Sequence, residues 1–313
     1  MNNTAVIGCG VWGSNHARVY HEISKSKLVA VADANEKRAQ EIGTRYHTKW
    51  YSDVGKVLDN PEIQTVSICT PTITHYEIAC KAIEAGKNVL VEKPMTDTVA
   101  QAKTLIKMAE KNGVKLTVGF VERFNPAVQE AIKRVKNDEI GDIVLAHTRR
   151  VSRRPERIGD VGVIKDLAIH DLDIINHLFD EKPKTVFAIA GKIKHVYEDY
   201  ANINITYSNN RNAFVETNWL TPRRIRTLEI TGTDGIINVE YPTQEITIEN
   251  NLQLVQPYLR NVEPLRLELE SFLNAIEFDR EPEVTGIDGI NALKLCEAAL
   301  ESSKSRIEVN ITE

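Results

Sequence analysis

The sequence has no apolar run that approaches the length needed to cross a bilayer. About 20 consecutive apolar residues are required, and the apolar stretches here are shorter and interrupted by charged side chains. The first segment, MNNTAVIGCG, has no basic region, no long apolar stretch and no small-residue cleavage site. We therefore expect a cytoplasmic protein without a membrane partner.

Cysteine is scarce, and positive charge is not in excess. The four cysteines, Cys9, Cys69, Cys80 and Cys296, show neither CxxC nor metal-ligand spacing, which favours buried reduced thiols. The formal net charge of -5 argues against a general affinity for nucleic acid. A chain of 313 residues, 42% hydrophobic and 27% charged, suits a globular protein of about two domains. Its partners should be small molecules or protein chains.

The first 120 residues alternate between short aliphatic runs and helical patterns. The aliphatic runs are rich in β-branched residues and predict strands, at Thr4–Ile7, Leu28–Ala32, Thr65–Cys69, Asn88–Val91 and Lys115–Val118. Between two of them, THYEIACKAIEAGK repeats apolar residues at spacings of three and four and ends at a glycine, which predicts a helix. This alternation predicts an α/β domain with a doubly wound parallel sheet.

A glycine-rich turn follows the first predicted strand. Gly8, Gly10 and Gly13 have the GxGxxG spacing, which permits a tight turn, close approach of a pyrophosphate and close packing of the next helix. Asp33 ends the second predicted strand, where a carboxylate can accept the ribose hydroxyls of a dinucleotide. The pattern predicts NAD rather than NADP, since Asp33 would repel a 2′-phosphate, although nearby Arg38 weakens that preference.

Lys93 follows a predicted strand and precedes Pro94, which cannot join a ladder and disfavours helix at Lys93. Ligands of open parallel sheets bind at the carboxyl ends of the strands. Lys93 is therefore a candidate for chemistry, and the alternative is a surface lysine at a turn.

The second half of the chain is rich in alternating segments, which predict a large, mostly antiparallel open sheet. We expect the helical segments PLRLELESFLNAIEF and GINALKLCEAALESSK to cover one face of that sheet. The border near VGFVERFNPAVQE is the expected junction. We predict a Rossmann NAD-binding domain at 1–121 and an α+β domain for substrate binding and oligomerisation at 122–313.

One predicted helix, VIKDLAIHDLDIINHLF, places Asp166, His170, Asp173 and His177 along one stripe. Asp166 and His170 are four residues apart, so the carboxylate can orient the imidazole for general acid–base catalysis. A solvated polar face is an equally simple interpretation. A metal site is disfavoured, because ligands on a single straight helix cannot easily surround one ion.

Together these features resemble the glucose-fructose oxidoreductase / inositol dehydrogenase / rhizopine catabolism (Gfo/Idh/MocA) family of NAD(P)-dependent sugar oxidoreductases. The resemblance rests on the glycine turn, TPTITHYEIA, VEKPMT and DLAIHDLD, and it spans nearly the whole chain. It implies a catalytic set of Lys93, Asp166 and His170. It also implies a cofactor contact from Thr70 and Pro71.

Further site residues and one departure complete the prediction. To the cofactor site we also assign Val11, Trp12, His75 and Glu92. To the substrate site we assign Asn125, Arg154 and Arg157. The resemblance implies a cis Lys93–Pro94 bond. Many family members have a run of glycines before the catalytic aspartate, whereas this chain has GDVGVIKD, so its substrate pocket is expected to differ there.

The chemistry of a secondary alcohol requires a base at its oxygen while hydride leaves its carbon for the nicotinamide. We predict His170 as the base, oriented by Asp166, with Lys93 donating to the same oxygen. Burial and bound NAD⁺ could instead make Lys93 the base. The sequence does not rank the two.

Two groups of arginines stand out in this acidic chain: Arg149, Arg150, Arg153, Arg154 and Arg157, and Arg223, Arg224 and Arg226. Arginine forks suit phosphate oxygens, and the alternative is a solvated, salt-bridged loop. The string RRPERIGDVGVIKDLAIHDLDI resembles the branch of the family that oxidises the C3 hydroxyl of UDP-N-acetylglucosamine with NAD. A nucleotide sugar is therefore the predicted substrate.

Three other functions remain open. An inositol 2-dehydrogenase or another free sugar or polyol dehydrogenase would keep every catalytic residue. An NAD-dependent glycosidase would use a transient C3 oxidation without consuming cofactor. A nucleotide-sensing protein would need neither Lys93 nor His170, which makes it the least favoured. The free face of the second predicted sheet suggests a homodimer or homotetramer.

Overall fold

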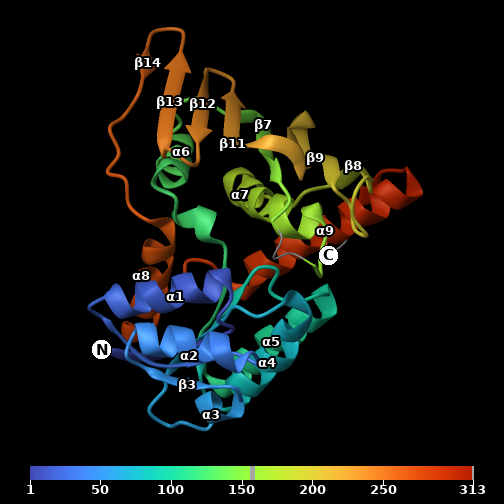
Figure 1. Cartoon of the computed structure of the whole chain (residues 1–313). Helices are drawn as coiled ribbons and strands as arrows, with labels where there is room; N and C mark the ends of the chain where they lie inside the picture. The colour runs from blue at the N-terminus through green and yellow to red at the C-terminus, as the bar shows by residue number, and fades with distance from the viewer. Residues whose placement is uncertain (156–158, 312–313) are drawn as a thin grey trace. The chain divides into compact units, whose positions relative to one another are not determined.

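The computed structural model describes residues 1–155 and 159–311 (Figure 1). The chain divides into two compact units. The first unit contains Met1–Val121 and Leu265–Ile290, and the second contains Glu122–Pro264 and the chain from Asn291 onward. The chain therefore returns to its first unit for one segment near the C-terminus, and each unit contains its own sheet.

The first unit contains a parallel sheet with strand order β3-β2-β1-β4-β5-β6. The strands are β1 (Asn2–Ile7), β2 (Ser26–Ala32), β3 (Lys49–Tyr51), β4 (Thr65–Ile68), β5 (Asn88–Glu92) and β6 (Leu116–Gly119). The strand order reverses at β1 and β4, so the prediction of a doubly wound sheet is confirmed. β3 was not predicted, because three residues are too few to show a period.

The helices that connect these strands have recognisable ends. They are α1 (Val11–Glu22), α2 (Glu36–Arg45), α3 (Gly55–Leu58), α4 (Thr72–Glu84) and α5 (Val99–Asn112). Asn35 caps α2 by accepting the N–H of Arg38. Thr98 and Gln101 form a capping box at α5, which ends at Gly113 in the left-handed region. Local sequence therefore determines the start of α2 and both ends of α5.

α8 (Pro264–Glu277) differs from the expectation that it would cover the second sheet. Its apolar side chains Leu265, Leu269 and Phe272 are buried in one cluster with Val6 and Tyr20 of the first unit. The periodicity of an amphipathic helix identifies its apolar face but not the surface that this face covers. The partner of α8 was therefore predicted wrongly.

The second unit contains a mixed sheet with strand order β14-β13-β12-β11-β7-β10-β9-β8-β15. The strands are β7 (Ile143–Arg153), β8 (Thr185–Gly191), β9 (Tyr200–Thr206), β10 (Asn212–Asn218), β11 (Leu220–Gly232), β12 (Gly235–Glu240), β13 (Glu245–Asn250), β14 (Leu254–Val255) and β15 (Val309–Asn310). β7 and β10 are parallel, and the other pairs are antiparallel. The predicted mostly antiparallel sheet is confirmed.

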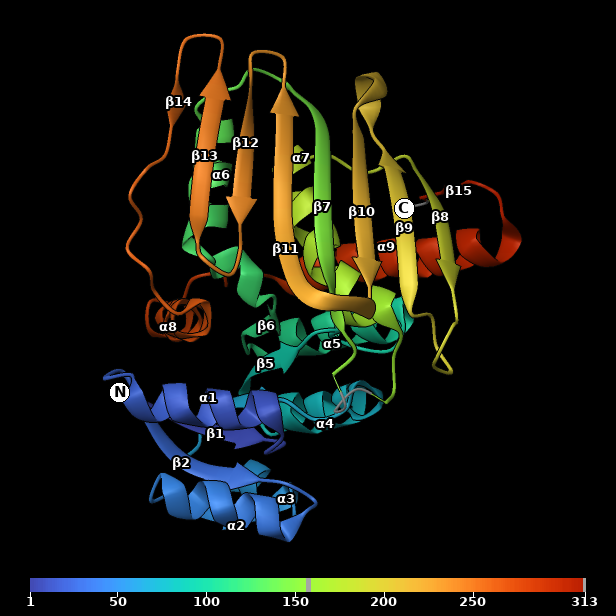
Figure 2. The same ribbon diagram turned by 45° about the horizontal axis from the view of Figure 1, so that its top comes forward.

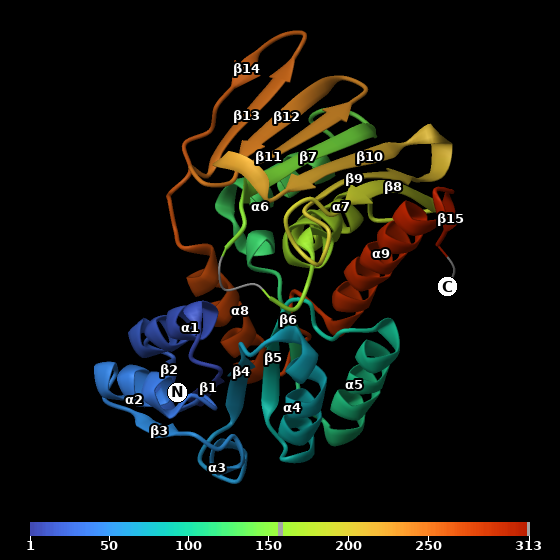
Figure 3. The same cartoon turned by 45° about the vertical axis from the view of Figure 1, so that its right-hand side comes forward.

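Helices lie on one face of this sheet (Figures 2 and 3). The short helix η1 (Val121–Phe124) spans the boundary between the units, since the second unit begins at Glu122. The helical segments within the second unit are α6 (Pro126–Lys136), η2 (Ile164–Ala168), α7 (Ile169–Phe179) and the short turn η3 (Ser208–Asn210). α9 (Gly286–Ser305) begins in the first unit and continues into the second, where Ser302 and Ser303 accept the backbone N–H groups of Ala188 and Ala190. α9 thus covers β8, as predicted. Among the described residues, no helix combines the length and the apolar character that a membrane span needs.

Candidate active site

In the turn between β1 and α1, neighbouring backbone leaves no room for a side chain at Gly8 or Gly13, but it leaves room for one at Gly10. Gly8 has φ +93°, and a Cβ there would lie 2.7 Å from the carbonyl carbon of Cys69. A Cβ at Gly13 would lie 1.6 Å from the carbonyl oxygen of Gly8. Among the described residues, a Cβ at Gly10 would meet no atom within 4 Å. The turn therefore leaves open space at Gly10, where the fingerprint expects a pyrophosphate.

The start of α1 suits an anion. Its N-cap is Gly10, no side chain caps the N–H groups, and the first turn contains no acidic residue. Val11 is exposed and Trp12 is partly buried at this end of the helix. Uncapped N–H groups and the positive end of the helix dipole favour phosphate oxygens. These residues therefore fit the diphosphate of NAD.

Asp33 directly follows β2 and is half-buried. Its Oδ2 accepts the N–H of Cys9 at 2.6 Å, and its Oδ1 accepts the N–H of Asn35 at 2.7 Å. Two N–H donors fix the carboxylate, and its remaining lone pairs suit ribose hydroxyls. Burial and, second, the charge of Asp33 raise the pKa of Cys9 to about 12, so this thiol stays protonated. Arg38 is exposed on α2.

Lys93 directly follows β5, and it is half-buried at the carboxyl end of that strand. The Lys93–Pro94 peptide is cis, as the resemblance implies. The Thr70–Pro71 turn follows the neighbouring strand β4, and the hydroxyl of Thr74 donates to that of Thr70 at 2.8 Å. Because β4 and β5 are parallel neighbours, both segments leave the same edge of the first sheet.

His75 and Glu92, both assigned to the cofactor, are buried and already engaged. The two ring nitrogens of His75 lie 2.8 Å from the carbonyl oxygens of Thr70 and Pro94. The Oε1 of Glu92 lies 3.0 Å from the Nε2 of His16, and its Oε2 accepts the N–H of Lys93 at 3.2 Å. No local pattern points to His16, because its partner Glu92 is 76 residues away.

In the second unit, Asp166 and His170 lie where a π-helical turn leads into an α-helix. Asp166 belongs to η2 and is 3% exposed, while His170 lies in the first turn of α7 and is 7% exposed. Asp173, farther along α7, is 2% exposed. The interpretation of this stripe as a solvated face is therefore wrong for these residues. Buried acid and imidazole groups one turn apart suit general acid–base catalysis.

Bidentate ion pairs fix α7. Asp171 accepts from the Nε and NH2 of Arg150 at 2.8 and 2.9 Å, and Asp173 accepts from the Nε and NH2 of Arg123 at 2.7 and 3.1 Å. Asp173 is thus an arginine partner. Among the described residues, no group of three or more His, Cys, Asp or Glu side chains could hold a metal ion.

Two of the arginines that were predicted to bind phosphate, Arg150 and Arg226, instead form ion pairs inside the second unit. Arg150 is 1% exposed and also donates to Glu122 at 2.8 Å, and Arg226 donates to the same carboxylate oxygen at 3.0 Å. Burial alone would lower the pKa of Arg150, but Asp171 and Glu122 raise it well above its ordinary value. Sequence patterning could not separate these buried arginines from exposed ones, because burial depends on the sheet. Arg149, half-buried, pairs with Glu216 on the neighbouring strand.

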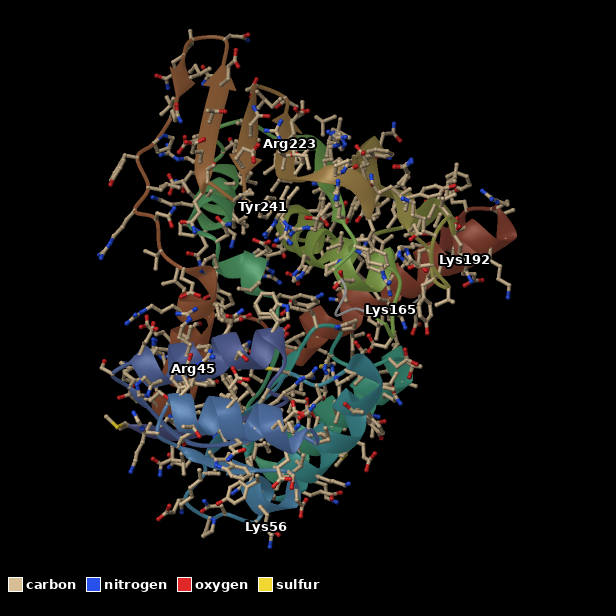
Figure 4. All side chains as sticks on the ribbon, in the orientation of Figure 1. Arg45, Lys56, Lys165, Lys192, Arg223 and Tyr241 are labelled. Carbon is tan, nitrogen blue, oxygen red and sulfur yellow. The ribbon has the colours of Figure 1, made fainter. Side chains whose placement is uncertain are left out.

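The remaining arginines meet at one end of the second sheet. Leu220 of β11 pairs with Arg153 of β7, but Ile225 pairs with Val151, so residues 221–224 of β11 bulge out of the ladder. The bulge contains Arg223 and Arg224, both exposed, and Arg223 is labelled in Figure 4. Register thereby places two arginine groups from distant parts of the sequence side by side.

Arg154 and Asn125, assigned to the substrate, differ in their surroundings. The Arg154 guanidinium lies 5.7 Å from the centre of the Trp219 ring, beside the arginine cluster. Asn125 is buried, where its Oδ1 caps α6 at the N–H of Ala127 and its Nδ2 donates to the carbonyl oxygen of Tyr241. Arg157, the third residue assigned to the substrate, lies outside the described residues.

The loop 193–199, between β8 and β9, is fixed by several hydrogen bonds. Asp199 accepts the N–H groups of Ile193, Lys194 and His195, and its other oxygen contacts the His195 ring. Although burial opposes this shift, the His195 contact and the backbone donors lower the pKa of Asp199 to about 2. The His195 ring meets the Trp219 ring edge-on. No sequence pattern predicted this loop. Through His195 it contacts Trp219, the ring over which Arg154 lies.

Comparisons with known proteins agree with this fold. The model of the "Oxidoreductase family, NAD-binding Rossmann fold" matches residues 2–120, and the "GFO/IDH/MocA C-terminal domain" matches residues 128–238. The chain is 30% identical to scyllo-inositol 2-dehydrogenase (NAD(+)) of Bacillus subtilis, over 98% of the chain and 95% of that protein.

The chain has the same sequence identity to an enzyme that acts on a nucleotide sugar. The chain is 30% identical to UDP-N-acetylglucosamine 3-dehydrogenase of Acidithiobacillus ferrooxidans, over 93% of each sequence. A solved structure of the Acidithiobacillus enzyme superposes with a TM-score of 0.90 at 29% identity, covering 97% of this chain and 98% of that one.

Proposed function

Because the chain belongs to the GFO/IDH/MocA family of NAD-binding oxidoreductases, we propose that it oxidises the C3 hydroxyl of UDP-N-acetylglucosamine to a ketone. At the coarser level, the chain is an NAD-dependent oxidoreductase of the sugar and polyol dehydrogenase type. The finer proposal concerns the substrate and the individual residues that act on it.

The observation that supports a nucleotide sugar is the arginine cluster of Arg153, Arg154, Arg223 and Arg224. In the described residues, Arg153, Arg223 and Arg224 form no ion pair with a carboxylate. Burial and, second, the charge of Arg150 lower the pKa of Arg226 to about 10, although the charge of Glu122 opposes this shift; the charge of Arg224 adds to the lowering. The guanidinium groups of Arg153, Arg223 and Arg224 therefore suit the oxygens of a diphosphate.

The catalytic roles follow from alcohol chemistry. When bound, NAD⁺ supplies the acceptor for the hydride that leaves the substrate carbon. His170 removes the proton of the hydroxyl, and Asp166 orients the ring that receives it. Lys93 donates a hydrogen bond to the same oxygen and stabilises the negative charge that develops there.

A free cyclitol is the second candidate substrate. Its support is the equal similarity of the chain to an inositol dehydrogenase and to a nucleotide-sugar dehydrogenase. An inositol carries no phosphate, so this function leaves the exposed arginines of β11 without a role in the reaction.

An assay of NADH formation with a panel of substrates tests the proposal. The panel contains UDP-N-acetylglucosamine, UDP-N-acetylglucosaminuronate, free N-acetylglucosamine and myo-inositol. We expect turnover of UDP-N-acetylglucosamine and background rates with the two unphosphorylated compounds. Turnover of only a free sugar or cyclitol would contradict the proposed substrate and favour the second candidate.

The variant Arg223→Ala/Arg224→Ala sharpens the same assay. If these side chains bind the diphosphate, KM for the nucleotide sugar should rise about ten- to a hundredfold with little change in kcat. Arg45→Ala is the matched control, because Arg45 is an exposed arginine on α2 that pairs with Glu41 (Figure 4). An unchanged KM in the double variant would assign the cluster to the solvated surface.

We further propose that the protein forms homodimers or homotetramers through the face of the second sheet on which the structure describes no helix. Leu145, Phe187 and Ile189 are exposed on this face, and the ring of His147 on β7 contacts the ring of Phe214 on the neighbouring strand β10. An apolar sheet face of this kind is a common interface between subunits.

A further inference from the structure

Two buried histidines flank the Lys93 turn in the first unit. His16 belongs to α1, which follows the glycine turn, and His75 belongs to α4, which follows the Thr70–Pro71 turn. The exposed fraction is 0% for His16 and 1% for His75. Each ring reaches one side of the segment 92–94. Both helices that begin at predicted cofactor-binding turns are therefore attached to the turn that presents Lys93.

The first attachment runs through Glu92. His16 contacts one oxygen of the Glu92 carboxylate at 3.0 Å, while the other oxygen accepts the backbone N–H of Lys93 at 3.2 Å. A Cβ at Gly119 would lie 3.0 Å from the same carboxyl group, so the backbone of β6 encloses it closely. A buried carboxylate with both oxygens engaged is costly to displace. The backbone of Lys93 is thereby tied to α1.

The second attachment places one ring between two carbonyl groups. The Nδ1 of His75 lies 2.8 Å from the oxygen of Pro94, and its Nε2 lies 2.8 Å from the oxygen of Thr70. A carbonyl oxygen only accepts hydrogen bonds, and a neutral imidazole has a single N–H. At this separation, a nitrogen lone pair facing a carbonyl oxygen would be repulsive. Two hydrogen bonds to these carbonyl oxygens therefore require a proton on each nitrogen of His75.

We propose that His75 is a doubly protonated positioning residue which, together with the His16–Glu92 pair, fixes Lys93 against the Thr70–Pro71 turn. The proposal rests on the role of Lys93 in the proposed function. It gives His75 and Glu92 a positioning role in place of the direct cofactor contact predicted from the sequence. A misplacement of about 1 Å in a reacting group can cost about a hundredfold in rate.

The protonation state is tested on the wild-type protein without any substrate. Nitrogen NMR of protein containing ¹⁵N-labelled histidine reports a bonded proton at each ring nitrogen, and the spectrum of His75→Gln assigns the His75 signals by difference. We expect both His75 nitrogens to be protonated at the pH of the activity assay. One protonated and one unprotonated nitrogen would overturn the doubly protonated ring.

The positioning role is tested by comparing kcat with the Kd for NAD⁺. In His75→Gln and His16→Gln, we expect kcat to fall about ten- to a hundredfold while Kd changes less than about threefold. His21→Gln, an exposed position on α1, is the control and should match the wild type. A large loss of NAD⁺ affinity with unchanged kcat would indicate direct cofactor contact and overturn the proposal.

The two proposals fail in different ways. If no member of the substrate panel is oxidised, the proposed function fails, while the NMR measurement still decides the state of His75. If UDP-N-acetylglucosamine is oxidised and His75 carries a single ring proton, the inference fails and the proposed function stands.

Discussion

Lys93 shows how a single residue acquires a role from its position in the chain. It follows a buried strand, precedes a proline, and its backbone N–H donates to the fixed carboxylate of Glu92. A lysine constrained in this way loses little backbone freedom when it binds a substrate oxygen. These features make Lys93 the first residue to test.

We predict that Lys93→Met lowers kcat by about 10²- to 10⁴-fold, because the variant cannot donate to the substrate oxygen or accept its proton. The Kd for NADH, measured by fluorescence titration, should stay within about twofold, since the glycine turn and Asp33 are untouched. Lys81→Met, on the exposed face of α4, is the matched control. An unchanged kcat would remove Lys93 from the mechanism.

Arginines illustrate the limit of arguments from residue type. Arg150 and Arg223 both belong to clusters that the sequence associates with phosphate. The first is buried between Asp171 and Glu122, and the second is exposed in a bulge. Alternation along β7 orients Arg150 toward the helices, but only the pairing of β11 with β7 decides which arginines lack an internal carboxylate.

At the scale of an element, the glycine turn is divided between structural and functional positions. A Cβ at Gly13 would overlap the carbonyl oxygen of Gly8, whereas a Cβ at Gly10 would meet no atom of the residues that the structure describes within 4 Å. Gly13 governs how closely α1 packs on β1, and Gly10 borders the space assigned to a diphosphate. Substitutions can therefore separate stability from cofactor binding.

We predict opposite effects of alanine at these two positions. Gly13→Ala should lower the free energy of unfolding by about 1–3 kcal/mol or more, because α1 must move away from β1. Gly10→Ala should leave that free energy nearly unchanged and weaken NAD binding at least about tenfold, because its methyl group occupies the space predicted for the phosphates. Urea unfolding and NADH titration measure the two effects.

Equal NAD affinity in Gly10→Ala and the wild type would contradict the assignment of the phosphates to this turn. A loss of stability in Gly10→Ala equal to that in Gly13→Ala would contradict the open space at Gly10.

α7 shows which properties of an element the sequence reveals. Its period correctly predicts a helix with Asp166 and His170 one turn apart, although η2 begins it with a π-helical turn. The period does not reveal that Asp173 and Asp171 are buried, because their arginine partners come from η1 and β7. Such partners lie 50 and 21 residues away in the sequence, beyond any local pattern.

At the scale of the whole molecule, the second sheet has one face covered by helices and one face on which the described residues place none (Figures 2 and 3). Leu145, Phe187 and Ile189 are exposed on the uncovered face. Antiparallel sheets can present one face to water, but the side chains on such a face are usually polar. The apolar side chains on this face therefore support the proposed contact with a second subunit.

We predict that the wild-type protein is a dimer or tetramer and that Phe187→Glu/Ile189→Glu is monomeric, because burying two carboxylates opposes association. Light scattering during size-exclusion chromatography measures the mass of each. Leu252→Glu, at an exposed position between β13 and β14, is the control and should keep the wild-type mass. A monomeric wild type would contradict the proposed assembly.

The sequence by itself determined the two sheets, the glycine turn, the helix with Asp166 and His170, and the family resemblance. These features depend on local periodicity, on turn chemistry and on short motifs, which act over a few residues. The tertiary structure alone decided the partner of α8, the burial of Arg150, the arginine cluster at the β11 bulge and the two carbonyl contacts of His75. Each of these depends on strand register and packing between distant segments, and no local pattern encodes such contacts.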